Sequence, residues 1–112
     1  MTREYKDYAM DMIAAIEKIE EFTSGMTPED FEKDTKTVFA VIRALEVIGE
    51  AAKKIPLSAR NRYKQIPWLQ ITGMRDKLIH EYFGVNIKVI WNTIKQDIPP
   101  LKPVIEQMLK DI

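Results

Sequence analysis

Apolar residues recur at intervals of three and four along most of the chain, which is the spacing of an amphipathic helix. The first apolar stripe comprises Tyr5, Tyr8, Ala9, Met12, Ile13, Ile16 and Ile19. Ser24 and Gly25 follow it and predict the end of this helix. Thr27 and Pro28 predict the start of another, because Thr is a common N-cap and Pro fits the first helical position.

The second helix is predicted to run from Pro28 to around Lys54, with Gly49 as its only interior breaker. Its apolar stripe comprises Phe31, Val38, Ile42, Leu45, Ile48 and Ala52. Beside the stripe runs a polar row of Arg43, Glu46 and Glu50. This row has two interpretations: an exposed ion pair within the helix, or side chains that support Arg75 further along the chain.

Pro56 is expected to end the second helix, and Ser58 to cap a short helical turn that reaches Tyr63. Pro67 is then predicted to begin a third long helix after Ile66. The apolar stripe of that helix comprises Ile71, Met74, Leu78, Ile79 and Tyr82. Gly84 follows as a C-terminal cap would.

Asn86 is the predicted N-cap of the last helical segment, whose apolar face comprises Ile87, Ile90, Trp91 and Ile94. Residues 97–100 (Asp-Ile-Pro-Pro) interrupt it, and a second stripe with Pro103 in its first turn follows, so a kink is expected. No segment alternates in the manner of a strand. Residues 1–112 are therefore predicted to form one all-α domain, an up-and-down four-helix bundle with a kinked last helix.

The composition of 46% hydrophobic and 30% charged residues is ordinary for a globular domain of 112 residues. No apolar run approaches the ~20 residues that span a bilayer, and the first residues lack a signal-peptide core, so a cytoplasmic protein without membrane association is expected. The chain has no cysteine and a single histidine. No pair of His or Cys has the spacing of metal ligands, so neither a metal nor a cofactor is predicted.

The net charge of zero hides an asymmetry between the two halves. Residues 1–50 carry 12 acidic and 6 basic side chains, whereas residues 51–112 carry 5 acidic and 11 basic ones. A stretch free of acids contains Lys53, Lys54, Arg60, Arg62 and Lys64. This cluster is either a solvated surface turn or a patch that attracts a polyanion such as RNA.

His80 is the side chain whose ordinary pKa lies nearest neutrality, and Arg75 carries the forked donors that suit a phosphate. Asp76 precedes His80 by one helical turn and could accept a hydrogen bond from the imidazole. On a regular helix, however, positions 75 and 80 diverge by about 140°. Either the long arginine side chain wraps around the helix, or a second copy of the chain completes the site.

The pattern R-x4-H-x-Y, formed by Arg75, His80 and Tyr82, resembles the motif of HEPN domains, in particular the HepT-like ribonuclease toxins. Three longer stretches carry the same resemblance: RALEVIGEAAKKIP, IPWLQITGMRDKLIHEYFGV and IWNTIKQDIPPLKPVIEQML. Together they cover most of residues 35–110.

The resemblance implies a homodimer, open to higher assembly, that cleaves single-stranded RNA without a metal ion. Arg75 would hold the phosphate, His80 would transfer protons, and Asp76 would orient His80. Toxins of this kind act beside a small nucleotidyltransferase antitoxin that attaches AMP to the motif tyrosine. That role falls on Tyr82 here.

A non-catalytic helical module that partners a nucleotidyltransferase is the competing interpretation. The intact set of Arg75, His80 and Tyr82 favours the ribonuclease. The acidic first half and the neutral net charge favour a protein partner over a nucleic acid.

Overall fold

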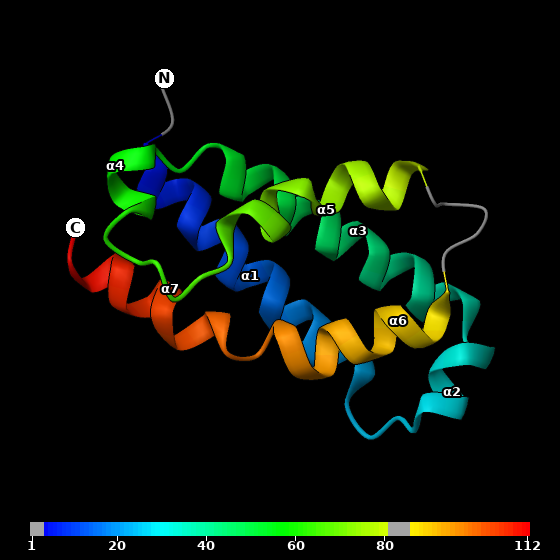
Figure 1. The fold of residues 1–112 in the computed structure, drawn as a ribbon. Coiled ribbons are helices and arrows are strands. Elements are labelled where there is room, and N and C mark those ends of the chain that lie inside the picture. The colour runs from blue at the N-terminus through cyan, green and yellow to red at the C-terminus, as the bar shows by residue number, and fades with distance from the viewer. Residues whose placement is uncertain (1–3, 81–85) are drawn as a thin grey trace.

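The computed structural model describes residues 4–80 and 86–112, and for residues 75, 79 and 80 only the backbone. Within these ranges the chain is helical and contains no β-strand (Figure 1). The elements are α1 (Tyr5–Thr23), α2 (Pro28–Lys33), α3 (Thr35–Lys53), α4 (Leu57–Arg60), α5 (Trp68–His80), α6 (Ile87–Asn92), the π-helical turn η1 (Thr93–Asp97) and α7 (Leu101–Lys110). The prediction of an all-α fold is confirmed.

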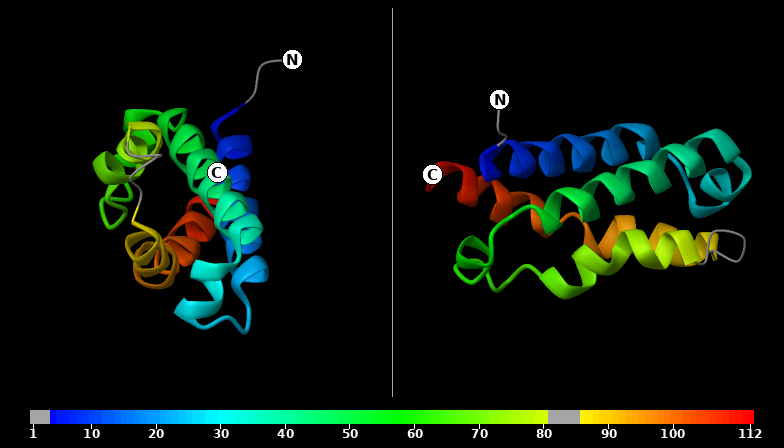
Figure 2. Two further views of the ribbon diagram at one scale, coloured as in Figure 1. Left: turned by 90° about the vertical axis from the view of Figure 1, so that its right-hand side faces the viewer. Right: turned by 90° about the horizontal axis from the view of Figure 1, so that it is seen from above.

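Helix α3 lies at the centre of the molecule, packed between α1 on one side and α5 on the other. Its side chains Val41, Leu45 and Ile48 are buried, because both of its broad faces meet another helix. Helix α7 packs along α1. Figure 2 shows α6 and α7 following one another along one side of the bundle. Consecutive long helices run in alternating directions (Figure 1), as an up-and-down arrangement requires.

The prediction of one uninterrupted helix from Pro28 to Lys54 is wrong. The chain breaks at Asp34, which ends α2 and caps α3. Its carboxylate accepts a hydrogen bond from the backbone N–H of Thr37 at 3.1 Å, and this bond lowers the pKa of Asp34. A short acidic side chain can satisfy a free helix N–H in this way, which offers the backbone an alternative to a continuous helix.

Three other predicted boundaries differ in their outcome. Helix α1 ends at Thr23, and Gly25 lies in the turn that follows with a φ of 75°, as expected. Thr27 caps α2 by accepting from the N–H of Asp30 at 3.1 Å, also as expected. The expected cap at Ser58 is wrong. Helix α4 begins at Leu57, directly after the extended residue Pro56, so Ser58 lies inside the helix.

The predicted interruption of the last helix is confirmed. Asn86 caps α6 by accepting from the N–H of Lys88 at 2.9 Å. The helix then widens into η1, closed by the N–H of Ile98 and the carbonyl of Thr93 at 3.0 Å, and α7 resumes at Leu101 after two prolines. None of the helices in the described ranges has both the length and the apolar character needed to cross a membrane.

Candidate functional site

Helix α5 carries the predicted catalytic residues. Arg75, Asp76 and His80 all belong to it, and His80 is its last residue. Tyr82 and the predicted cap Gly84 lie outside the described residues. The expectation that one continuous helix holds positions 75 and 80 is therefore confirmed, and the direction of their side chains stays a prediction.

Two contacts hold α5 in place. Along its length, Ile71 and Leu78 are buried, and the helix packs against α3. At its start, the indole N–H of Trp68 donates to the carbonyls of Arg60 and Tyr63, at 3.1 and 3.0 Å. The helix is thereby anchored to the α4 region.

The Asp76 carboxylate lies 3.9 Å from the ammonium of Lys53, at the C-terminal end of α3. Both side chains are well exposed to solvent, so the pair contributes little to stability. Its value is positional, since it places the predicted basic cluster directly beside the motif helix. The role of Asp76 in orienting His80 stays a prediction.

The polar row on α3 contains the ion pair expected from its spacing. The Arg43 guanidinium lies 3.3 Å from the Glu46 carboxylate, three residues further along the helix. Glu50 is half-buried on the same helix. A contact between this row and Arg75 stays a prediction.

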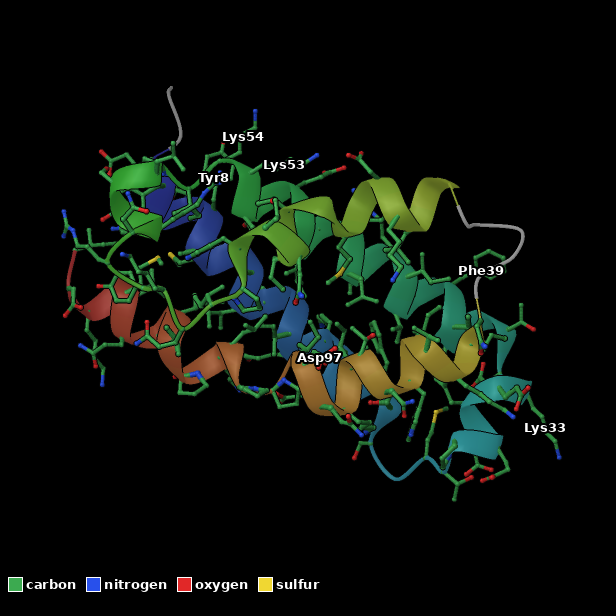
Figure 3. All side chains as sticks on the ribbon, in the orientation of Figure 1. Tyr8, Lys33, Phe39, Lys53, Lys54 and Asp97 are labelled. Carbon is green, nitrogen blue, oxygen red and sulfur yellow. The ribbon has the colours of Figure 1, made fainter. Side chains whose placement is uncertain are left out.

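The five residues of the basic cluster differ in what their side chains contact. Arg60 donates from Nε to the carbonyl of Ile55 at 2.8 Å and from Nη2 to the carbonyl of Lys53 at 3.0 Å. Its guanidinium thus closes the C-terminal end of α3. The other four, of which Figure 3 labels two at that end of α3, are exposed: Lys53, Lys54, Arg62 and Lys64.

Tyr63 joins this region to the end of the chain, and sequence reasoning missed the contact. Its hydroxyl donates to the carboxylate of Asp111, which also accepts from the amide of Gln107 at 2.9 Å. The hydrogen bond to Asp111 raises the pKa of Tyr63, and the hydrogen bonds from Tyr63 and then Gln107 lower the pKa of Asp111. We call Arg60, Tyr63, Trp68 and Asp111 together the α4 clasp.

A cavity of about 770 Å³ opens between α5 and the α6–η1 segment. We call it the α5–α6 groove. Leu45 of α3 lines it, and Leu69, 88% exposed, stands among its lining residues. The remaining lining residues are Pro67, Gln70, Ile71, Gly73, Met74, Lys77, Leu78, Asn86, Val89, Ile90, Thr93 and Asp97. The helical stripes alone did not reveal it, because several of these residues fit the pattern of an ordinary core.

Comparison with known proteins covers nearly the whole chain. Residues 12–108 match the family model described as ribonuclease HepT-like. The chain is 54% identical over 110 residues to "Probable ribonuclease HepT" of Thermococcus cleftensis, covering 98% of this chain and 100% of that protein. It is 44% identical over 110 residues to "Putative RNase MJ0125" of Methanocaldococcus jannaschii, covering 98% and 95%. No solved structure matches.

Proposed function

The chain belongs to the family of HepT-like ribonucleases, and on that premise we propose that it cleaves single-stranded RNA internally and without a metal ion. The observation that carries the proposal is the motif on α5. Arg75 and His80 lie on one continuous helix that α3 and Trp68 hold in place. The matched range of residues 12–108 includes the entire motif.

In the proposed reaction the ribose 2′-hydroxyl is the nucleophile. His80 removes its proton, the 2′-oxygen forms a bond to phosphorus, and the bond from phosphorus to the 5′-oxygen breaks. The leaving 5′-oxygen takes up a proton, so the products are a cyclic phosphate and a 5′-hydroxyl. Arg75 stabilises the charge that develops on the phosphate oxygens.

We propose a two-fold dimer as the active form. Positions 75 and 80 diverge by about 140° on a regular helix, so one chain does not aim both side chains at the same phosphate. A second copy would supply the missing side chain, and its His80 could act as the acid while the first acts as the base. A single monomeric species in sedimentation at micromolar concentration would contradict this.

The test of catalysis compares the wild-type protein with His80→Ala on a single-stranded RNA and on DNA of the same sequence. We expect the wild type to cut only the RNA, because DNA lacks the nucleophile, and the variant to cut neither. Circular dichroism must show that the variant keeps its helical content. A folded His80→Ala protein that cleaves as fast as the wild type would favour the non-catalytic interaction module.

The exposed basic residues around the end of α3 suit the RNA backbone. Lys53 contacts Asp76 on the motif helix, so a strand bound by this cluster would pass beside the proposed site. Arg60 differs, since its guanidinium already donates to two carbonyls. We expect Lys53→Ala with Lys54→Ala to weaken RNA binding and to reduce its salt dependence. Unchanged binding would remove the cluster from the proposal.

Regulation by a nucleotidyltransferase antitoxin is the second part of the proposal. Transfer of AMP to Tyr82 would add a bulky anion close to Arg75 in sequence, which would block a phosphate by size and by repulsion. When each protein is co-expressed with the cognate antitoxin, we expect intact mass to show added AMP on the wild type and none on Tyr82→Phe. An adduct that persists in Tyr82→Phe would contradict this assignment.

A further inference from the structure

We propose that the α5–α6 groove binds one unstacked base of the RNA and prefers a base that carries an exocyclic amino group. This inference rests on the proposed function, since it names a part of the substrate that the same protein would hold. It concerns a separate set of residues from those of the motif.

The groove has room for a base and has an apolar floor. Its volume of about 770 Å³ falls within the range of small-ligand pockets. Leu45, Ile71 and Ile90 line it, and each is almost completely buried, so they form an apolar surface against which the face of a base can be shielded from water. Such a floor binds any base and does not by itself select one.

Selection would come from two side chains of η1. Thr93 donates its hydroxyl hydrogen to the carbonyl of Val89 at 2.8 Å, which leaves its oxygen only as an acceptor. Asp97 is exposed, and across residues 4–80 and 86–112 its carboxylate has no hydrogen-bond or ion-pair partner. Figure 3 shows Asp97 on the α5 side of η1. Two acceptors fit the amino group of cytosine or adenine, whereas the keto oxygen of uracil would face them unfavourably.

The backbone of η1, which forms one wall of the groove, is also unusual. Residues 93–97 form a π-helical turn, a conformation that is rare and often occurs at functional sites. The wider turn lies at the residues that supply the two acceptors. This observation is independent of the composition of the groove.

The opposite wall of the groove is the motif helix. Met74, Lys77 and Leu78 line the groove, and they are interleaved along α5 with Arg75 and His80. A base seated between the walls would therefore keep its own phosphodiester near the motif helix. The ammonium of Lys77 offsets the repulsion between Asp97 and the phosphates.

The direct test uses two ligand pairs in which a keto oxygen replaces the amino group and the adjacent ring nitrogen gains a hydrogen: cytidine with uridine, and adenosine with inosine. We expect cytidine and adenosine to shift the methyl NMR signals of Leu45, Ile71 and Ile90, and uridine and inosine to shift them far less. Asp97→Asn should abolish this difference. Glu106→Gln, which alters an exposed carboxylate on α7 away from the groove, should retain it. Equal shifts from both members of each pair would overturn the proposal.

The second test maps cleavage sites in a random single-stranded RNA library. Wild type and Glu106→Gln should favour amino-bearing bases at one fixed position relative to the cut, and Asp97→Asn should lose that preference by about tenfold. The nucleoside experiment needs no cleavage, so the selective shifts would support the groove site even if RNA remained intact. Cleavage whose base preference survives Asp97→Asn would overturn the proposal and leave the ribonuclease standing.

A second copy of the chain is the competing occupant of the groove. The Leu69→Lys variant tests for it, because Leu69 is exposed at the groove. If that substitution converts a dimer to a monomer in sedimentation, and no nucleoside shifts the groove methyl signals of the wild type, a partner subunit covers the groove and the base site is overturned. We expect the oligomeric state to be unaffected by Leu69→Lys.

Discussion

The α4 clasp and the α5–α6 groove meet at the start of α5, where Trp68 belongs to the clasp and Leu69 lines the groove, and they use their polar side chains in opposite ways. In the clasp, Arg60 and Trp68 donate hydrogen bonds to backbone carbonyls, and the hydroxyl of Tyr63 donates to the carboxylate of Asp111. In the groove, Asp97 has no such partner within the described part of the chain. A polar group whose hydrogen bonds are made inside the fold stabilises it, whereas one that faces a cavity is available to a ligand.

Arg60→Ala should have the largest effect on stability. It removes two charge-assisted hydrogen bonds to carbonyls at the end of α3, which should lower the free energy of unfolding by about 2–3 kcal/mol. Urea denaturation measures this loss. Arg62→Ala is the matched control, because Arg62 is exposed and its removal should change stability by less than about 0.5 kcal/mol. Equal losses in the two variants would show that Arg60 has no special structural role.

Tyr63→Phe should cost less than Arg60→Ala, and the cost should depend on pH. The lowered pKa of Asp111 means that its bond to Tyr63 stabilises the fold above the ordinary pKa of 3.8 and is lost as pH falls through the lowered value. The raised pKa of Tyr63 means that the contribution is also lost as pH rises above 10.0 toward the raised value. Thermal unfolding across pH should therefore separate the two proteins most at neutral pH. A difference that does not shrink in acid would contradict the assignment of the bond.

Asp97→Asn should have the smallest effect on stability, below about 0.5 kcal/mol, because the carboxylate is exposed and unpartnered within the described ranges. Urea denaturation beside Arg60→Ala tests this. The same variant should lose base discrimination, which no clasp variant should do while folded. A stability loss as large as that of Arg60→Ala would place Asp97 among the structural residues and remove the contrast between the two regions.

Local chemistry in the sequence determined most of the elements. The apolar stripes predicted the long helices, and the caps at Thr27 and Asn86 and the prolines after Ile98 marked boundaries that the structure confirms. The break at Asp34 was missed because an acidic residue within a helical stripe is compatible with either a helix interior or a cap. The motif around Arg75 and His80, together with the longer stretches beside it, identified the family before any geometry was known.

Only the tertiary structure decided which polar side chains make hydrogen bonds inside the fold and which stay available to a ligand. Arg60 and Arg62 are indistinguishable as members of a basic cluster, yet only the guanidinium of Arg60 reaches the end of α3. Tyr63 and Asp111 are separated by 48 positions, so no short-range pattern connects them. The α5–α6 groove likewise requires three helices to meet, since an apolar stripe records that a face is covered but not what covers it.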